Sequence, residues 1–501
     1  MSTLHKVLFY NWAPALNPEK LGGGVAVYQD NCILSFLNKG WQVHSLSAGN
    51  SYDAFGGRPY ITKICDGPKS HVAFILVNSP VVAPTENSFF TDQVTAGSSE
   101  DRKVAAALHE FIQSNGPYDV VHFNNLEGLP ASVLPMLRQE FCNTRFVFSL
   151  HNYYPLCPQV NLWKNNSTNC DGKEGGRACM SCLGADALGK YKARASDVVS
   201  DRAISDLIFG RLAQPRRNFV RRAVRKCLRI ARAHRALTFL RRRFGIAFAF
   251  EAEYELQKND LAAYFDGREQ KLAQIINGSF DVILCVSERV RIIAQSAGLS
   301  AVKCKVSYIG SKFYRTPLPV RKPTNDRVLR LAFLGYANKL KGFDFLLSAL
   351  ERCPDGLLRK LNLMIAARGI DRNIKDRLSA LAYKVDGLTV HKGYTHGQLD
   401  ELLSDVDLGV VPVVWEDCLP QVAIEFVCNG VPIVTSDLGG AREIASNADF
   451  EFNTGSHDGL IRLLEKFSDD KQKLSGFWKK EPILRSMDAH ITELLVHYGS
   501  L

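Results

Sequence analysis

The sequence has no run of about 18 uninterrupted apolar residues, which is the length that a membrane-spanning helix needs. Its first ten residues also lack a basic region followed by a long apolar stretch, the pattern of a secretory signal. Thirteen cysteines in 501 residues are too sparse for a disulfide-held scaffold. These absences argue against a helical membrane protein and a small secreted domain. They predict a cytoplasmic protein, at most bound to the cytoplasmic face of a membrane.

What is present is an ordinary globular composition with one unusual segment. Hydrophobic residues make up 46% and charged residues 23%, which excludes disorder over most of the chain. At about 150 residues per domain, the length predicts roughly three domains or two large ones. The net charge is +11, yet residues 207–250 alone carry thirteen Lys and Arg and no Asp or Glu. Subtracting thirteen from eleven leaves the remainder at −2, so the whole chain is not a polycation of the nucleic-acid-binding kind.

Apolar runs alternate with helical patterns in the first 150 residues, and the alternation resumes with a strand at 281–286. Strands that are apolar throughout and separated by helices predict a parallel sheet covered on both faces. The expected elements are a helix at 25–39 and strands at 7–10, 42–46, 72–77, 119–123 and 145–150.

A proline-rich stretch at 315–326 predicts an interdomain linker, after which the alternation restarts. We therefore predict two doubly wound, Rossmann-like α/β domains that face a cleft. The predicted units are an N-terminal domain at 1–314 with an insertion at about 155–275, a C-terminal domain at 327–482, and a helix at 483–501 that packs back on the first domain. In the second domain, strands are expected at 330–334, 361–366, 388–391, 407–411 and 431–435, and helices at 343–351, 397–404 and 421–428. Ligands of such sheets bind at the carboxyl ends of the strands, which points to the cleft.

The most informative residues lie at 415–440. A strand delivers Glu416 and Asp417 into a loop, Pro420 opens a helix, and Glu425 follows one and a half turns later. Loop amides and the helix N-terminus can hold sugar hydroxyls or a phosphate, and Glu425 can accept hydrogen bonds from a ribose diol. The alternative is that Asp417 is only a favourable charge at a helix start and Glu425 a solvated one.

An acidic residue, seven further residues and a Glu, followed by Gly-x-Pro-x-Val and Gly-Gly, resembles the motif of retaining nucleotide-sugar glycosyltransferases with the GT-B fold, closest to glycosyltransferase family four. The resemblance covers both halves of the chain except about 155–275. Two positions depart from the family pattern. Asp417 replaces the usual Glu, so that Glu416 can be the functional acid instead. Tyr336 replaces an Arg at a strand end, where Lys339 is the candidate substitute.

The resemblance implies that 1–314 is an acceptor domain and that 327–482 is a nucleotide-sugar-binding domain on the other side of the cleft. Lys341, with help from Lys339, would stabilise the donor diphosphate, Glu425 would hold the ribose, and Asp417 or Glu416 would orient the donor sugar. His151, at the end of a strand, would contact the sugar near the reacting centre. Transfer would proceed with retention and without a catalytic metal. The further residues expected at the donor are Gly23, Gly24, Gly335, Cys418, Leu419 and Pro420. A glycine triplet such as 22–24 is otherwise an ordinary turn.

Four cysteines within 26 residues, at 157, 170, 179 and 182, end in a C-x2-C pair that suits tetrahedral zinc. A structural zinc bound by Cys157, Cys170, Cys179 and Cys182 is one interpretation. Unligated thiols and disulfides are the others, and none implies a catalytic role.

The basic segment at 207–250 has apolar residues at helical spacing with Arg on the other side. Such a helix can lie on an anionic membrane, pack on its own domain, or bind RNA, although no aromatic-rich RNA motif accompanies it. Membrane contact fits a saccharide or lipid-linked acceptor used for a cell-surface polysaccharide or glycolipid. Two other functional classes stay open: a GT-B-fold nucleotide-sugar epimerase, and a catalytically weak membrane- or nucleic-acid-binding scaffold.

Overall fold

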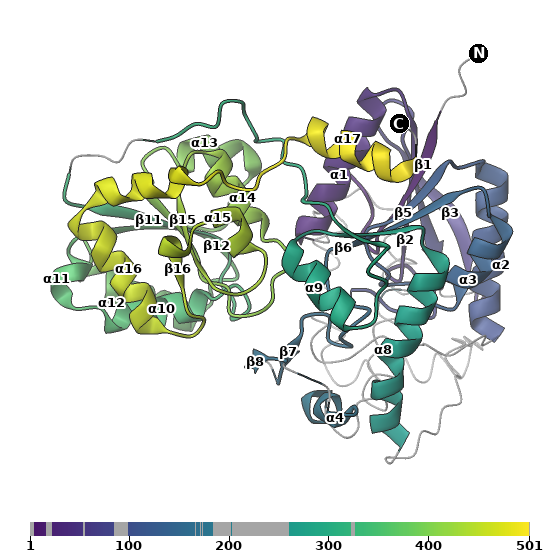
Figure 1. Cartoon of the computed structure of the whole chain (residues 1–501), viewed down its shortest axis with the longest axis horizontal. Helices are drawn as coiled ribbons and strands as arrows, with labels where there is room; N and C mark the ends of the chain where they lie inside the picture. Colours follow the sequence, from purple (N-terminus) through teal and green to yellow (C-terminus); the bar gives the residue numbers. More distant parts are fainter. Residues whose placement is uncertain are drawn as a thin grey trace, which may run out of the picture.

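The computed structural model describes residues 5–16, 23–53, 56–84, 99–165, 167–170, 172, 174–183, 202, 260–321 and 326–499. Two α/β domains lie side by side, each built on its own sheet (Figure 1). This is the two-domain doubly wound architecture that the sequence predicts. Within the described ranges, no helix is both long and apolar enough to cross a lipid bilayer.

The N-terminal domain is built on an eight-stranded sheet in the order β10-β9-β6-β5-β1-β2-β4-β3. Its core strands are short apolar runs that helices cover, so their side chains are buried on both faces. The strands are β1 (Lys6–Tyr10), β2 (Gln42–Ala48), β3 (Tyr60–Asp66), β4 (Val72–Val77), β5 (Val120–Phe123), β6 (Arg145–Leu150), β9 (Val282–Cys285) and β10 (Cys304–Val306). The helices are α1 (Gly23–Asn38), α2 (Ser99–Asn115), α3 (Val133–Glu140), α8 (Asp260–Ser279) and α9 (Glu288–Ser296).

The edge strand β3 departs from the predicted all-parallel sheet. It pairs antiparallel with β4 and exposes nearly all of its side chains. A strand of this kind carries no continuous apolar run, which is why the sequence pattern does not reveal it.

The C-terminal domain has a wholly parallel six-stranded sheet in the order β13-β12-β11-β14-β15-β16. This is the Rossmann order, in which the chain direction across the sheet reverses between the first and fourth strands, here β11 and β14. The strands are β11 (Leu329–Tyr336), β12 (Leu361–Arg368), β13 (Gly387–His391), β14 (Leu408–Val411), β15 (Ile433–Ser436) and β16 (Glu451–Phe452). The helical elements are α10 (Phe343–Arg352), α11 (Asp355–Leu358), α12 (Arg372–Ala382), η1 (His396–Gln398), α13 (Leu399–Leu402), α14 (Gln421–Cys428), α15 (Ala441–Ala445), η2 (Ala448–Phe450), α16 (His457–Asp469) and η3 (Lys471–Lys479).

The chain returns to the N-terminal domain at its end. Helix α17 (Met487–Tyr498) packs against α1, as the yellow helix in Figure 1 shows. The hydroxyl of Tyr498 lies 2.6 Å from Nδ1 of His122, and the hydroxyl of Tyr28 lies 2.8 Å from Nε2 of His490. These buried contacts tie the last helix to the sheet of the first domain.

The region predicted as an insertion contains a small hairpin of β7 (Trp163–Lys164) and β8 (Thr168–Asn169), followed by α4 (Arg177–Leu183). Helix α8 packs on α4 and α3, and its Arg268 is 2% exposed. The Arg268 guanidinium donates to the carbonyl oxygens of Tyr154 and Pro155 at 2.9 and 3.2 Å, which anchors the start of this region. The basic segment at 207–250 lies outside the described residues.

Candidate active site

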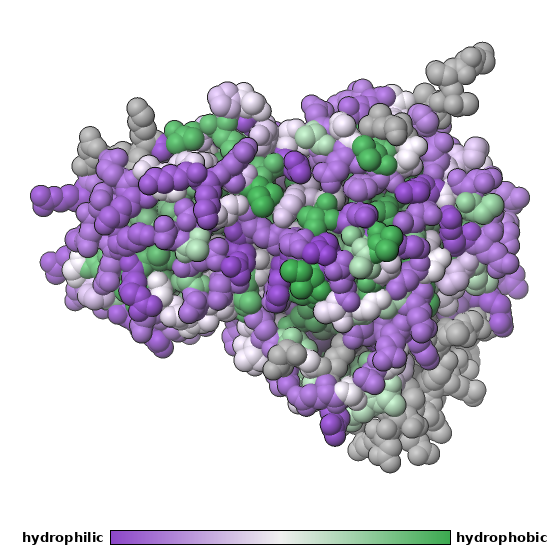
Figure 2. Space-filling view, in the orientation of Figure 1, coloured by the Kyte–Doolittle hydropathy of each residue, from purple (hydrophilic) through white to green (hydrophobic). Residues whose placement is uncertain are grey.

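A cavity of about 780 Å³ lies between the two domains and is lined by residues of both. From the C-terminal domain it receives the ends of β11 and β14, which flank the point where the strand order reverses. This is the position at which ligands bind in doubly wound sheets. On the face shown in Figure 2, apolar residues gather near the domain junction within a largely hydrophilic surface.

Lys341 and Asp417 form an ion pair in the cavity wall. The Nζ of Lys341 lies 2.5 Å from Oδ2 of Asp417 and above the ring of Trp415. The Asp417 side chain is 10% exposed, so burial strengthens this pair relative to one in water. The loop that carries Lys341 is fixed by a hydrogen bond from its own amide to Asn338 Oδ1, at 2.9 Å.

Glu425 lies in α14, and its buried carboxylate is held from both sides. The Tyr394 hydroxyl donates to Oε2 at 2.5 Å, and Nε2 of His396 lies 3.2 Å from Oε1. Both partners come from the segment that follows β13 and also line the cavity. Burial and the nearby carboxylate raise the pKa of Tyr394, so the phenol keeps the proton that it donates to Glu425. A carboxylate accepts about four hydrogen bonds, so acceptor sites remain for a ligand.

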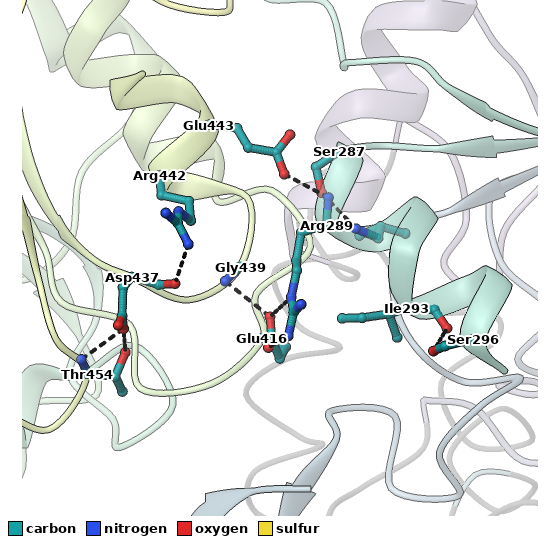
Figure 3. A network of polar contacts seen from close by, with 11 residues as sticks. Ser287, Arg289, Ile293, Ser296, Glu416, Asp437, Gly439, Arg442, Glu443 and Thr454 are labelled. Atoms are coloured by element: carbon teal, nitrogen blue, oxygen red, sulfur yellow. Dashed lines mark hydrogen bonds and ion pairs between the residues drawn. The ribbon is translucent and has the colours of Figure 1, made fainter. Parts of the chain in front are cut away.

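Glu416 does not line the cavity, so the alternative that it acts there in place of Asp417 has no geometric support. Its carboxylate makes a two-point contact with the Arg289 guanidinium of α9, and its Oε2 accepts from the Gly439 amide at 3.2 Å. Figure 3 shows Arg289 reaching across the domain boundary to Glu416. The acid next to Asp417 therefore belongs to an interdomain contact.

A second carboxylate joins the domains at the N-terminus of α9. Glu443 of α15 accepts from the amides of Glu288 and Arg289, each at 2.8 Å, and from the Tyr308 hydroxyl at 2.7 Å. The N-cap residue Ser287 donates to the Cys418 carbonyl at 2.8 Å. An acid from one domain thus satisfies the free amides of a helix in the other.

His151 directly follows β6 and lines the cavity from the N-terminal domain. Its ring lies 4.5 Å from that of Tyr28, and its Nε2 has no hydrogen-bond partner among the described residues. Burial, with a smaller effect from His490, lowers the pKa of His151 to about 3. The imidazole is therefore neutral at pH 7 and suited to hydrogen bonding a ligand rather than to carrying charge.

Of the remaining predicted donor residues, all except Lys339 line the cavity. Gly23 and Gly24 lie at the N-terminus of α1, where Gln421 of α14 donates to the Gly24 carbonyl at 2.6 Å across the cleft. Lys339 is exposed and does not line the cavity. The others in the cavity wall are Gly335, Cys418, Leu419 and Pro420.

The comparisons with known proteins add a family to this geometry. Residues 317–481 match the family model described as "Glycosyl transferases group 1". The C-terminal domain is thus similar to the group 1 glycosyl transferases. This domain contains the Lys341–Asp417 pair and Glu425.

Two curated relatives match shorter segments. An uncharacterised protein "in cps region" of Klebsiella pneumoniae is 31% identical over 24% of this chain and 29% of its own length. An uncharacterised glycosyltransferase of Methanocaldococcus jannaschii is 26% identical over 37% of this chain and 42% of its own length. The chain thus matches less than half the length of either relative.

Solved structures extend the likeness over both domains. The Anabaena HepE protein in complex with UDP covers 99% of this chain with all of its own length, at a TM-score of 0.54 and 13% identity. At that identity the likeness shows the fold, which is the GT-B arrangement of two Rossmann-like domains. The fold class predicted from the sequence is confirmed.

Three cavity residues beside the group 1 motifs are missed by the sequence reasoning: Arg368, Tyr394 and His396. Arg368 ends β12, and the other two follow β13. The predicted strands at 361–366 and 388–391 lead directly to them. Polar residues just beyond the carboxyl ends of parallel strands were therefore the available signal.

The four cysteines predicted as zinc ligands are all free thiols. Cys157 and Cys179 are buried, and Cys170 and Cys182 are half-buried. Among the described residues, no group of three or more His, Cys, Asp or Glu side chains is arranged to hold a metal ion. The Cys182 sulfur instead accepts from the Asn165 amide at 3.1 Å. Zinc binding stays a prediction from the cysteine spacing alone.

Asp30 of α1 faces the cavity and gives a pH-dependent prediction. Burial raises its pKa to about 6, although the Leu16 amide donates to its Oδ1 at 2.7 Å. Because the folded-state pKa lies above the unfolded value, ionising Asp30 disfavours folding as the pH rises from about 4 to about 6. Asp30→Asn keeps the acceptor and removes the charge. We expect it to stabilise the protein at pH 7.5 by up to about 3 kcal/mol and to have little effect at pH 4.

Thermal unfolding of both proteins at the two pH values measures this difference. Asp376→Asn, on an exposed position of α12, is the matched control and should show no comparable gain. An advantage of Asp30→Asn that is equal at pH 4 and pH 7.5 would rule out the charge as its cause.

Proposed function

We propose that the protein is a retaining glycosyltransferase that moves a sugar from a nucleotide-diphosphate sugar to an acceptor hydroxyl. One observation carries the proposal. The C-terminal domain brings the Lys341–Asp417 pair and the buried Glu425 carboxylate into one interdomain cavity, at the point where the strand order reverses. The UDP complex of a protein with the same fold supports a nucleotide-bearing donor.

In the proposed mechanism, the acceptor hydroxyl is the nucleophile, the nucleoside diphosphate is the leaving group, and the hydroxyl proton passes to an oxygen of the departing diphosphate. Negative charge grows on the diphosphate as the glycosidic bond breaks. Lys341 stabilises that charge from a site held in advance by Asp417 and by its own loop, which is the kind of effect that often dominates catalysis. No protein nucleophile is required for this step.

The other cavity residues bind the donor and orient it. The Glu425 carboxylate accepts hydrogen bonds from the ribose diol, with Tyr394 and His396 fixing its position. Asp417 orients the donor sugar. The neutral His151 offers Nε2 to a sugar hydroxyl from the opposite domain. Contact of both domains with one ligand excludes water, which limits hydrolysis of the donor.

We further propose an acceptor at the cytoplasmic face of a membrane, such as a lipid-linked saccharide used for a cell-surface polysaccharide or glycolipid. Its support is the sequence at 207–250, where thirteen cationic residues and no acids occur with apolar residues at helical spacing. The proposed enzyme chemistry does not depend on this assignment.

A ligand screen tests the donor site. Any ligand that binds only the folded state must raise the unfolding temperature. We expect one series among UDP, GDP and ADP, with their sugar conjugates, to stabilise the purified protein. In Glu425→Ala the shift should be lost or strongly reduced, because the variant lacks the ribose acceptor.

Glu401→Ala serves as the control, because Glu401 is an exposed acid of α13 in the same domain that does not line the cavity. Circular dichroism checks that both variants fold. Stabilisation by one nucleotide series that survives in Glu401→Ala and fails in Glu425→Ala supports the proposal. No stabilisation of the unmodified protein at millimolar ligand would overturn it.

A further inference from the structure

The cavity wall has an uneven distribution of positive charge. Among the described residues, the cationic side chains of Lys and Arg that line it are Lys312, Lys341 and Arg368. Lys341 is already paired with Asp417, and the Lys312 ammonium lies 5.2 Å from the centre of its neighbouring Phe313 ring. Within the described chain, the Arg368 guanidinium has no hydrogen-bond or ion-pair partner. Among the described C-terminal-domain Lys and Arg residues that line the cavity, Arg368 is thus the one whose charge is not paired with an acid.

Strand register brings Arg368 to the point where the strand order reverses. β11 and β12 pair in parallel, and Tyr336 and Arg368, the last residues of the two strands, are register partners. Neighbouring strands lie about 4.8 Å apart, so a long side chain at the end of β12 reaches a ligand bound beyond the end of β11. Tyr336 itself provides no cation there.

Gly393 gives Arg368 the space to lie over the cavity wall. Gly393 has a φ of +81°, and a Cβ at this position would lie 2.7 Å from Cγ and 3.0 Å from Nε of Arg368. The stem of Arg368 therefore crosses the backbone at Gly393, immediately before Tyr394, the residue that holds Glu425.

We propose that Arg368 binds the diphosphate of the donor and shares its charge with Lys341. This inference rests on the proposed function of the same cavity. A diphosphate joins the ribose at Glu425 to the sugar at Asp417, and its charge exceeds what a lysine already paired with an aspartate can balance. The planar guanidinium offers two parallel N–H groups to phosphate oxygens, which an ammonium does not.

Calorimetric titration of the full chain tests this assignment with two probes, a nucleoside diphosphate from the series that binds the unmodified protein and the matching nucleoside. We expect Arg368→Ala to weaken binding of the diphosphate by about 10- to 100-fold and binding of the nucleoside by less than about twofold. The diphosphate affinity of Arg368→Lys should lie between those of the unmodified protein and Arg368→Ala. Arg372→Ala, an exposed residue outside the cavity, should bind both probes normally.

The outcomes separate the two proposals. If the unmodified protein binds no nucleoside diphosphate, the proposed function itself fails. If that protein binds and Arg368→Ala is unchanged, the role of Arg368 is refuted. Equal weakening of nucleoside and diphosphate would refute it too, because Arg368 would then serve the base or ribose.

Gly393→Ala provides a second test that does not alter a charge. The added methyl group must displace the stem of Arg368. We expect Gly393→Ala to weaken diphosphate binding in the unmodified background and to add little in the Arg368→Ala background. Backbone strain at φ +81° is common to both backgrounds and cancels in this double-mutant cycle. Additive losses would contradict the proposed coupling.

Discussion

Replacing Lys341 by alanine is expected to lower the rate of sugar transfer by about 10²- to 10³-fold. In the proposed mechanism, the variant removes the positioned charge at the diphosphate, and preorganised electrostatic groups typically contribute that much. It also leaves the Asp417 carboxylate, 10% exposed, without its partner 2.5 Å away. Release of nucleoside diphosphate from the donor identified in the ligand screen, followed over time, measures the effect.

Lys339→Ala is the matched control, because this exposed lysine lies two residues away in the same loop and outside the cavity. It should retain turnover within about twofold. Combining Lys341→Ala with Asp417→Asn should recover stability without recovering turnover, since it removes the unpaired buried charge but not the need for a cation. Turnover of Lys341→Ala within threefold of the unmodified enzyme would show that Lys341 is not the principal cation.

Gly342→Ala is expected to cost more than about 4 kcal/mol of stability. A Cβ at Gly342 would lie 1.6 Å from the Pro412 carbonyl oxygen, and the φ of +70° disfavours any side chain. Neither backbone segment can give way, because one begins α10 and the other follows β14. For a domain of this size the loss corresponds to a fall in unfolding temperature of about 8–16 °C.

The comparison is with Gly356→Ala in α11, where a Cβ would meet no atom within 4 Å. Alanine is the better helix former, so this variant should unfold at the unmodified temperature or slightly above it. Thermal unfolding followed by circular dichroism distinguishes the two. An unchanged unfolding temperature for Gly342→Ala would mean that the loop carrying Lys341 adopts another conformation.

Much of the fold could be predicted because its buried strands are short apolar runs. The predicted strand at 72–77 coincides with β4, and the predicted helix at 421–428 coincides with α14. Proline at the start of that helix and glycine after its end mark its limits in the sequence. The helices α2 and α12 were not predicted; α12 is mostly exposed, and its few buried side chains leave only a weak apolar pattern.

The motif residues could be found in the sequence because they are close together along the chain or stand at a strand end. His151, Lys341, Asp417 and Glu425 all line the cavity, and their chemical roles stay predictions. Arg368 could not be singled out in the same way. Its relation to Tyr336 depends on the register between β11 and β12, which is set by tertiary packing and not by local spacing.

Glu416 is a residue that the sequence predicts as a candidate and that the structure places outside the cavity. Its neighbour Asp417 is a motif residue, and local spacing cannot tell which of two adjacent acids points into the cavity. The structure separates them, because the loop after β14 directs Asp417 toward Lys341 and Glu416 toward Arg289. The partner of Glu416 lies 127 residues earlier, in the other domain.

That pairing has a consequence for protein engineering. Exchanging the C-terminal domain of this protein for that of a relative would leave Arg289 opposite a foreign residue and the amides of α9 without Glu443. Grafting the C-terminal domain onto another protein would leave the Glu416 carboxylate, whose side chain is 8% exposed, without its Arg289 partner. The loss would cost about 3–5 kcal/mol of stability. A working chimera must therefore carry residues 287–289 together with the C-terminal domain, so that the boundary of the exchangeable unit lies inside the N-terminal domain and not at the linker.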